Sequence, residues 1–341
     1  LMKAFAAALA LALPAASALA QDSVADFYRG KQVFLRIGSA PGSGYDIAGR
    51  LVGAHIGKHI PGNPQVIIQN VPGAGSLTLT NQLYNTAPRD GTVIGAITNG
   101  MPTAPILSPD TARFDLQKFG WIGSSAPETI MVMLWHTSPT KTIDDLYKRE
   151  TVVGGVAHGT ATVDNPLMAN AFLGTKFKLV SGYEGTTHID LAMERGEVEG
   201  RGSNSWAAWN STKPEWLRDK KIHILVQIGL KRHPDLPNVP LMLELATNEA
   251  DRKVLEFISA ETNVARSLIT TAGVPAERVE ALRRAFDATM KDPEFLAEAA
   301  KSTMDMSPST GEEAQKIAEG IANTPAEVAA RARALIEAPQ K

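Results

Sequence analysis

Residues 36–51, RIGSAPGSGYDIAGRL, join a predicted strand to a predicted helix. The strand is the apolar and β-branched run at 32–37 that leads into them. The helix is the segment 47–60, where apolar residues recur at helical spacing. Between the two lie glycines, other small residues and Asp46. Small residues let a ligand approach the backbone, and the N–H groups at a helix N-terminus favour an anion. The stretch therefore predicts a strand–loop–helix unit suited to a phosphate, a catalytic serine or a carboxylate.

The order of strand, small-residue loop and helix recurs along the chain. Further strands are predicted at 65–69, 92–97, 131–135, 151–156, 177–180 and 222–228. Four of the loops carry Gly with Ser or Thr and end at a candidate helix N-cap, which we place at Asp46, Ser76, Thr162 or Asp164, and Thr186. Alternating strands and helices predict parallel βαβ units, whose loops meet at the carboxyl ends of the strands, where ligands bind.

This pattern predicts an α/β fold with two lobes, each a mainly parallel sheet flanked by helices. No low-complexity segment or long linker separates two halves of the chain. We therefore expect the middle block to form one lobe and the two ends together to form the other. The expected bounds are 22–124 with 231–341 for the first lobe, and 125–230 for the second lobe.

The N-terminal residues are typical of a secretory signal. Lys3 precedes an apolar run at 4–13, and Ala18-Leu19-Ala20 provides a cleavage motif, so we expect removal after Ala20. The chain has no cysteine, which suits an exported bacterial protein in the periplasm better than a small disulfide-stapled secreted domain. The formal net charge of −2 gives no basic surplus of the kind that nucleic-acid binding requires, so no nucleic-acid partner is expected.

Motifs for other chemistry are incomplete. The dinucleotide-binding fingerprint needs a third glycine where Ile47 stands, and the P-loop spacing fails at 53–58. The nucleophile-elbow motif G-x-S-x-G does not occur. His55 and His59 are four residues apart, but no acidic third ligand lies nearby in the sequence. We therefore expect no metal, no cofactor and no catalytic residue, and we interpret Asp46 as a helix cap.

Several motifs together resemble the tripartite tricarboxylate transporter solute-receptor family, the TctC or Bug proteins. They are GSGYDIAGR at 42–50, HIPGNP at 59–64, QNVPGAGS at 69–76, APRDGTVIG at 87–95, LGTKFK at 173–178, GYEG at 182–185, AMERGEVEG at 192–200 and GVPAERV at 273–279. The resemblance covers nearly all of the chain that follows the predicted signal. The chain departs from it at NVARSL, residues 263–268, where relatives carry a G-R-P-like segment near the connection of the lobes. Ser43 also stands where many relatives have a further glycine.

The resemblance implies a monomeric periplasmic receptor with a type II periplasmic-binding-protein-like fold and the ligand between the lobes. Such a receptor captures a small organic acid, a carboxylate or dicarboxylate, and delivers it to the membrane permease subunits of a tripartite transporter. Two loops of the first lobe hold the carboxylate through backbone N–H groups and hydroxyls, and the second lobe clamps it. The implied ligand-binding residues are Ser39, Ala40, Gly42, Ser43, Gly44, Tyr45, Asp46, Pro72, Gly73, Ala74, Gly75, Ser76, His158, Gly159, Thr160, Thr162, Gly185, Thr186 and Thr187.

Arg201 carries a separate hypothesis. It follows a short predicted strand of the second lobe, and small neighbours such as Ser203 leave room for a ligand. A guanidinium binds a carboxylate through two parallel hydrogen bonds, so Arg201 and Ser203 are added to the predicted site, with Arg201 on a distal carboxylate. The alternative is that Arg201 pairs with a structural acid such as Glu199.

Two other functions remain open on the same fold. One is an enzyme that acts on an organic acid, which would require an acid–base pair or metal that the motifs do not provide. The other is a sensory receptor that signals to a membrane kinase. Glycine-rich loops recognise a carboxylate and not the rest of the molecule, so the sequence does not identify the acid.

Overall fold

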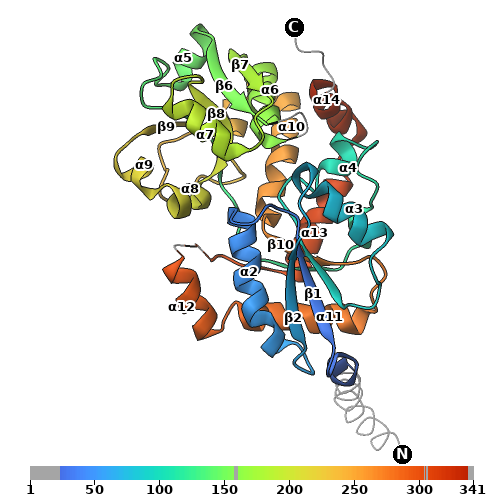
Figure 1. Cartoon of the computed structure of the whole chain (residues 1–341). Helices are drawn as coiled ribbons and strands as arrows, with labels where there is room; N and C mark the ends of the chain where they lie inside the picture. Colours follow the sequence, from blue (N-terminus) through green and yellow to red (C-terminus); the bar gives the residue numbers. More distant parts are fainter. Residues whose placement is uncertain (1–23, 157–159, 303, 305, 337–341) are drawn as a thin grey trace, which may run out of the picture.

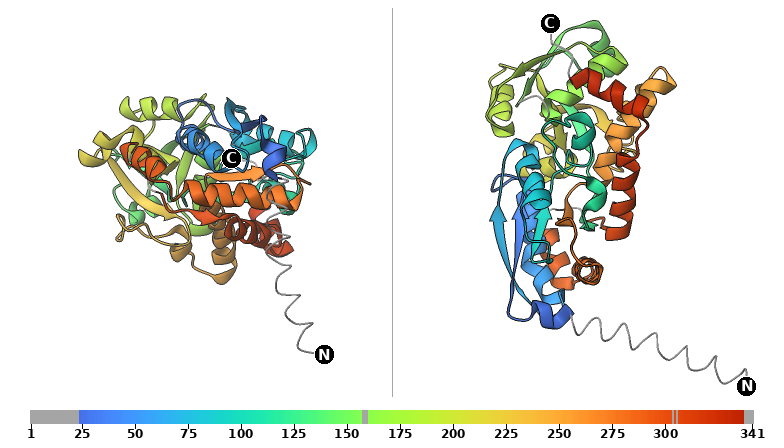
Figure 2. Two further views of the ribbon diagram at one scale, coloured as in Figure 1. Left: turned by 90° about the horizontal axis from the view of Figure 1, so that it is seen from below. Right: turned by 90° about the vertical axis from the view of Figure 1, so that its right-hand side faces the viewer.

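The computed structural model describes residues 24–156, 160–302, 304 and 306–336, so the expected signal at 1–20 lies outside it. Two β-sheets, each flanked by helices, form two lobes stacked along the long axis of the molecule (Figure 1). The side view in Figure 2 shows the same division. Within the described ranges, no helix combines the length and the apolar character that crossing a membrane requires.

The first sheet has six strands in the spatial order β11-β4-β10-β3-β1-β2. They are β1 (Gln32–Ile37), β2 (Gln65–Asn70), β3 (Val93–Ala96), β4 (Trp121–Ser124), β10 (Ser267–Thr270) and β11 (Ser309–Thr310). β1 pairs in parallel with β2 and β3, whereas β10 runs antiparallel to β3 and β4. β1, β2, β3 and β4 therefore share one direction, as predicted, and β10 and β11 run against them. β10 is antiparallel because the chain returns from the second lobe and enters at the edge where the parallel strands end.

The second sheet has five strands in the order β7-β6-β8-β5-β9. They are β5 (Ile130–Trp135), β6 (Thr151–Gly155), β7 (Phe177–Ser181), β8 (Gly200–Ser205) and β9 (Ile222–Ile228). β6 is parallel to β7 and β8, while β5 is antiparallel to β8 and β9, so β5 runs against the other four strands and the sheet is mainly parallel, as predicted. The antiparallel strand is the one through which the chain enters this lobe.

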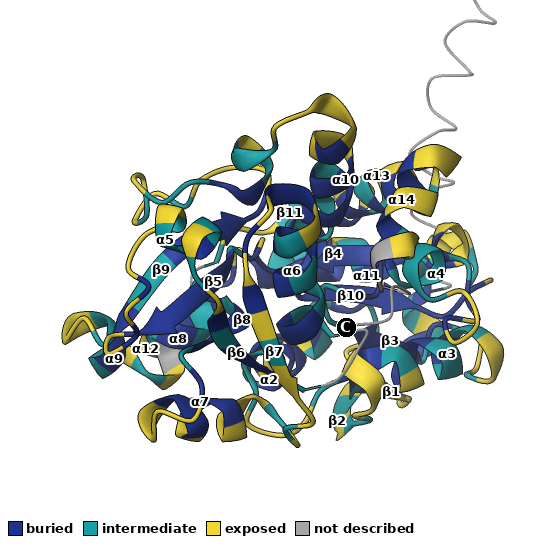
Figure 3. Ribbon diagram, turned by 90° about the horizontal axis from the view of Figure 1, so that it is seen from above, coloured by how far each residue is buried: buried dark blue, intermediate teal, exposed yellow. Residues whose placement is uncertain are grey.

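Helices flank each sheet, so the inner strands are mostly buried, while the edge strand β7 and the outer helix faces are exposed (Figure 3). The α-helices are α2 (Gly44–Ile56), α3 (Leu77–Asn85), α4 (Ala104–Leu107), α5 (Ile143–Lys148), α6 (Ala161–Met168), α7 (Thr186–Glu194), α8 (Trp206–Thr212), α9 (Pro214–Arg218), α10 (Glu249–Ala260), α11 (Ala276–Thr289), α12 (Pro293–Lys301), α13 (Gly311–Ala322) and α14 (Ala326–Ile336). Short helical turns are η1 (Gly57–His59), η2 (Ala74–Ser76), η3 (Leu116–Lys118), η4 (Ala169–Leu173), η5 (Met242–Leu245) and η6 (Glu261–Val264).

The core of each lobe follows from the two-residue period of its strands. In β5, Ile130 and Val132 join one hydrophobic cluster while Met131 and Met133 join another, because successive side chains point to opposite faces. The first of these clusters also contains residues of α10 and α14, and the first sheet packs instead against α11 and α12. The C-terminal helices are therefore shared between the two cores. The lobe bounds expected from the sequence stay a prediction.

Two crossing segments, 125–129 and 261–266, connect the lobes and lie side by side. The Glu128 N–H donates to the Thr262 carbonyl (2.8 Å), and the Ser125 N–H donates to the Arg266 carbonyl (3.4 Å). Paired crossings of this kind allow two lobes to move about a common axis, as in hinge closure around a ligand.

Candidate functional site

The loops that follow β1, β2 and β3 converge at one edge of the first sheet. The Asn70 side chain donates to the Ser39 carbonyl (3.0 Å), and the Thr98 hydroxyl donates to the Gly75 carbonyl (2.7 Å). Gly38 lies so close to the second loop that an added Cβ would sit 1.7 Å from Ser76 Oγ. The structure thus brings together the two loops that the sequence predicted to hold a carboxylate.

The N-terminus of α2 is capped by Ser43, and not by Asp46 as the sequence predicted. Ser43 Oγ accepts from the Asp46 N–H (3.2 Å), which places Asp46 at the third helical position. Its carboxylate accepts from the Gly42 N–H (2.8 Å), the Asn70 amide (2.7 Å) and the Arg50 guanidinium (2.9 Å). Burial alone would raise the pKa of Asp46, but these hydrogen bonds lower it below its usual value. The Asp46 carboxylate is therefore ionised, and its hydrogen bonds fix the conformation of the first loop.

This arrangement decides which N–H groups of the first loop are left without a partner in the described part of the chain. The Gly42 N–H is taken by Asp46, and the Ser43 hydroxyl donates to Ser39 Oγ (2.8 Å). Among the described residues, the N–H groups of Gly44 and Tyr45 have no hydrogen-bond partner. They belong to the first turn of α2, where unpaired N–H groups and the helix dipole favour an anion. Gly44 and Tyr45, rather than Gly42, therefore carry the N–H groups of this loop that remain available to an anion, and their contact with a ligand stays a prediction.

The second loop has a left-handed backbone over four successive residues. The φ angles are 144° at Gly73, 44° at Ala74, 61° at Gly75 and 85° at Ser76. Ser76 is the N-cap residue of α3, as predicted, but its side chain does not cap the helix. Its Oγ is buried against Gly38 and has no hydrogen-bond partner in the described part of the chain. Left-handed Ala and Ser residues store strain, which is typical of binding loops.

The predicted clamp of the second lobe lies at the ends of β6 and β7. Thr160, and not Thr162 or Asp164, is the N-cap residue of α6; Thr162 Oγ1 accepts instead from the Val156 N–H (3.1 Å). Gly185, and not Thr186, is the N-cap residue of α7. In each case the N-cap residue precedes the expected one, because the helix begins before the first apolar residue of the pattern that predicted it. His158 and Gly159 lie outside the described residues.

The two loops of the clamp also contact each other. The Gly182 N–H donates to the Val156 carbonyl (3.0 Å), which holds the end of β7 against the end of β6. Thr186 and Thr187 are exposed beside these ends. The structure therefore places the described clamp residues at one edge of the second sheet, and their contact with a ligand stays a prediction.

Arg201 is buried and engaged by the protein itself. Its Nη1 lies 2.5 Å from Asp190 Oδ1, and its Nε donates to the Ser203 carbonyl (2.8 Å). Burial lowers the pKa of Arg201, and the nearby carboxylate of Asp190 opposes that shift. Glu199, the acid named from the sequence, pairs instead with Arg149 (2.7 Å). These contacts favour the structural alternative for Arg201, with Asp190 as its partner.

A buried polar cluster at the lobe crossing was not predicted, apart from Tyr45. The Tyr45 hydroxyl donates to Glu128 Oε2 (2.6 Å) and accepts from the Asn99 N–H (3.2 Å). Glu128 also lies 3.4 Å from Arg266 Nη2. Burial and the Glu128 carboxylate raise the pKa of Tyr45, so the phenol stays protonated and acts as a donor. The only signal in the sequence was the departure from the family pattern at residues 263–268.

Glu261 stands beside this cluster on the second crossing segment. It accepts from the Thr103 hydroxyl (2.5 Å). Burial raises its pKa to about 8, against the hydrogen bond from Thr103 and with the added effect of Asp164 and Glu128. Asp164 belongs to the second lobe, so Glu261 lies where charges of both lobes meet.

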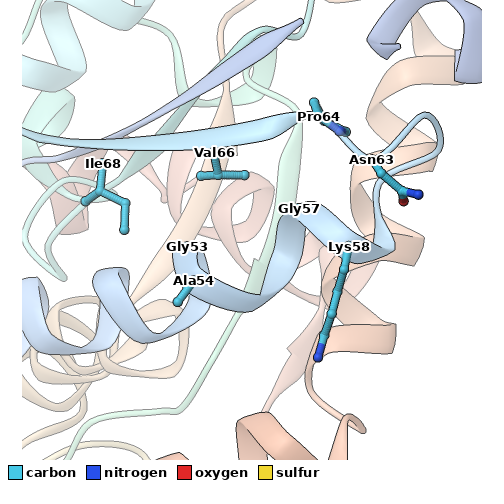
Figure 4. A pocket seen from close by; sticks show the side chains of 8 residues that line it. All are labelled: Gly53, Ala54, Gly57, Lys58, Asn63, Pro64, Val66 and Ile68. Atoms are coloured by element: carbon cyan, nitrogen blue, oxygen red, sulfur yellow. The ribbon is translucent and has the colours of Figure 1, made fainter. Parts of the chain in front are cut away.

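Two hollows on the described surface lie away from the converging loops. One of about 440 Å³ lies between α2 and the edge strand β2 (Figure 4). It is lined by Gly53, Ala54, Gly57, Lys58, Asn63, Pro64, Val66 and Ile68. Another is formed by α3 and residues 110–113. Neither contains a residue of the predicted site, so neither is a candidate for the ligand.

The fold does bring acids at the start of α12 to His55 of α2 and His59 of η1. The ligand atoms of His55, Asp292 and Glu294 lie within 4.8 Å of one another. The ammonium of Lys58, however, lies 2.6 Å from Asp292 and 2.7 Å from Glu294, so both carboxylates already have a cation. His59 also contacts Asp292 (2.9 Å). The cluster is an ion-pair network that fastens α12 to α2.

Comparisons with known proteins agree with this architecture. The sequence profile described as tripartite tricarboxylate transporter family receptor matches residues 54–339. A TctC solute-binding protein from Polaromonas has 18% identity and a TM-score of 0.64, over 91% of this chain and 99% of its own. MatC from Rhodopseudomonas palustris, solved with bound malate, has 18% identity and a TM-score of 0.64, over 90% and 99%.

A second R. palustris protein, solved with adipate, has 18% identity and a TM-score of 0.65, over 89% of this chain and 97% of its own. At such identities these structures show the two-lobed fold. No curated protein sequence matches the chain.

Proposed function

The chain belongs to the tripartite tricarboxylate transporter family of receptors, and we propose that it captures a small organic acid and delivers it to the permease of such a transporter. The proposal places the protein in the periplasm as a monomer, after removal of residues 1–20. It assigns no chemical turnover to the protein. The family supports the receptor role, and the solved structures with malate and adipate support a carboxylate as the ligand.

The observation that carries the proposal is the convergence of two small-residue loops on the first turn of α2. The N–H groups of Gly44 and Tyr45 have no partner among the described residues, and the strained loop 73–76 packs against Gly38, in the loop that leads into α2. Backbone N–H groups at a helix N-terminus bind a carboxylate without the desolvation cost of a buried lysine. The loops at the ends of β6 and β7 complete the site when the lobes close.

Closure follows from the way the chain crosses between lobes. The two crossing segments are joined by backbone hydrogen bonds, so they bend as one unit. A ligand that contacts both lobes stabilises the closed arrangement by its difference in affinity for the closed and open forms. The permease would then recognise the closed receptor.

We call the N–H groups of Gly44 and Tyr45, together with the loop 73–76, the proposed cradle. Gly44 offers a direct test of it. It occupies the first helical position, where proline is well tolerated, and Ser43 before it has φ −73° and ψ 161°, which suits a residue preceding proline. Gly44→Pro therefore deletes one N–H that no described residue uses, without breaking the helix. Gly44→Ala is the matched control, because it keeps the N–H and its Cβ meets only the Ala208 methyl at 3.8 Å.

The experiment is a thermal-shift screen of the mature protein against malate, adipate, citrate and monocarboxylates, followed by calorimetry with the best acid. We expect one acid to bind per chain. The affinity should be roughly tenfold weaker in Gly44→Pro, because one charge-assisted hydrogen bond is lost, and unchanged in Gly44→Ala. Equal binding by both variants would reject the cradle. Steady loss of the acid from an NMR spectrum of the mixture would favour the enzyme alternative.

A further inference from the structure

Arg266 lies at the edge of the first sheet where the candidate loops meet. It directly precedes β10, and the Ile97 N–H after β3 donates to the carbonyl of Ser267 (3.1 Å). In the antiparallel pairing of β10 with β3, Leu268 lies opposite Ala96, the last residue of β3. The start of β10 is therefore beside the end of β3, at the level of the loops that follow the parallel strands.

The guanidinium of Arg266 is buried with incomplete pairing. Its side chain is 4% exposed, and its nearest acid is Glu128, at 3.4 Å from Nη2. Nε and Nη1 have no hydrogen-bond partner among the described residues. The buried Arg201, by contrast, has a carboxylate at 2.5 Å and a carbonyl at 2.8 Å. Buried charged groups normally form hydrogen bonds with all of their polar atoms. Two unpaired nitrogens on a buried guanidinium therefore indicate a partner outside the described part of the chain.

The backbone of Arg266 carries strain in addition. Its φ angle is 53°, in the left-handed region that a long side chain rarely adopts. Strain of this kind persists where the surrounding structure fixes a residue for a purpose. Here the neighbours that fix it are the two crossing segments, through the hydrogen bond from the Ser125 N–H to the Arg266 carbonyl (3.4 Å).

The cluster connects Arg266 to the cradle. Glu128 accepts from the Tyr45 hydroxyl (2.6 Å), and Tyr45 is the second residue of α2. The same residue offers one of the two unpaired N–H groups of the first loop. Arg266 is therefore linked to the N-terminus of α2 through the carboxylate of Glu128 and the side chain of Tyr45.

From these contacts we infer that Arg266 is the charged anchor of the site and binds a carboxylate of the ligand through the nitrogens that Glu128 leaves unpaired. The inference rests on the proposed function and adds the residue that recognises the charge. Backbone N–H groups bind any small anion. A buried guanidinium instead favours a ligand that places a full negative charge beside it. It also assigns the role to Arg266 in place of Arg201, whose guanidinium is occupied.

Glu128 sets a second expectation. Its carboxylate competes with the ligand for Arg266 and repels an anion nearby. Glu128→Gln keeps the shape of the side chain and removes that charge. If Arg266 is the anchor, the variant binds the acid more tightly, because the guanidinium has no other anion to pair with. A purely structural ion pair predicts only the smaller gain that comes from the lost repulsion between Glu128 and the anion.

The experiment measures dissociation constants by calorimetry for Arg266→Gln, Arg266→Lys and Glu128→Gln. The probe is the acid of the malate, adipate and citrate panel that most stabilises the unmutated protein, with its neutral amide as the comparison. Arg149→Gln is the matched control, because Arg149 also pairs with a glutamate but precedes β6, at the opposite end of that strand from its ligand-facing loop.

We expect the affinity for the acid to fall roughly 10- to 100-fold in Arg266→Gln, the range of a hydrogen bond to a charged group. Arg266→Lys should recover part of the loss, Glu128→Gln should bind more tightly than the unmutated protein, and Arg149→Gln should bind equally. Unchanged affinity in Arg266→Gln, or equal weakening for the acid and its neutral amide, overturns the inference. If Arg266→Gln does not fold, Glu128→Gln decides together with Arg266→Lys: tighter binding in Glu128→Gln with weaker binding in Arg266→Lys supports the anchor, and any other combination rejects it. Failure of the unmutated protein to bind any acid would reject the proposed function itself.

Discussion

Replacing Ser76 by glycine should stabilise the protein, although the residue is fully buried. Its φ of 85° costs a non-glycine residue roughly 1–2 kcal/mol. Its hydroxyl has no partner among the described residues, which costs about 1 kcal/mol or more. Against these gains, glycine loses about 0.5–1 kcal/mol of extra chain entropy on folding, and the missing side chain leaves a small void. The balance is a stabilisation of about 1 kcal/mol.

The assay is urea unfolding at pH 7, compared with Ser76→Ala, which removes the hydroxyl but keeps the strained backbone. We expect Ser76→Ala to gain less than Ser76→Gly. If both variants lose more than about 1 kcal/mol, the hydroxyl has a partner in solution and the reasoning fails.

Gly38 provides an independent check of the same contact. A Cβ at this position would lie 1.7 Å from Ser76 Oγ and 2.7 Å from Ser76 Cβ. Gly38→Ala alone should therefore destabilise the protein by roughly 1–3 kcal/mol through overpacking. Combined with Ser76→Gly, which clears the space, it should cost much less, and this non-additivity is the signature of direct contact. Simple addition of the two effects would contradict the packing.

Three further outcomes follow from the structure. Arg201→Gln should lower the free energy of unfolding by about 3–5 kcal/mol, because it leaves the carboxylate of Asp190 buried and unpaired; a change in ligand selectivity without loss of stability would contradict this. Glu261, with a pKa near 8 when folded against 4.5 for the free group, holds its proton more tightly in the folded state. Stability should therefore fall as pH rises from 4.5 to about 8, by at most about 1.4 kcal/mol per pH unit, and urea unfolding of Glu261→Gln at pH 6, 7 and 8 should lack that slope. Small-angle scattering should show a smaller radius of gyration at saturation with the acid, and an unchanged radius would count against closure of the lobes.

Local patterns of sequence identified most strands and the two loops of the first lobe. The run at 32–37 alternates buried and partly exposed residues because it is a strand whose two faces differ. The helix start was placed three residues late, since Gly44 and Tyr45 carry no apolar periodicity although they are helical. Ser43 and Asp46 are both good cap residues, and only the hydrogen bonds of the folded chain show which of them caps the helix.

Such local patterns do not predict contacts between residues that are far apart in the sequence. β10 enters the first sheet between β3 and β4, more than a hundred residues away, and its antiparallel direction depends on how the chain returns from the second lobe. The partner of Arg201 is Asp190, on a neighbouring helix, whereas the sequence suggested the acid two residues away. The pairing of Glu128 with Arg266 likewise joins positions 138 residues apart.

The position of Tyr45 explains how a ligand at the first lobe can influence the hinge. Its backbone N–H has no partner among the described residues, while its hydroxyl donates to Glu128 on the first crossing segment. The Glu128 N–H in turn donates to the Thr262 carbonyl on the second crossing segment (2.8 Å), and its carboxylate faces Arg266. A carboxylate that draws the Arg266 guanidinium away from Glu128 would weaken that contact and leave Tyr45 as the main partner of Glu128. Because both crossing segments depend on Glu128, the charge of the ligand would bias the lobe equilibrium through a single residue, and Glu128→Gln should therefore change affinity and the extent of closure together.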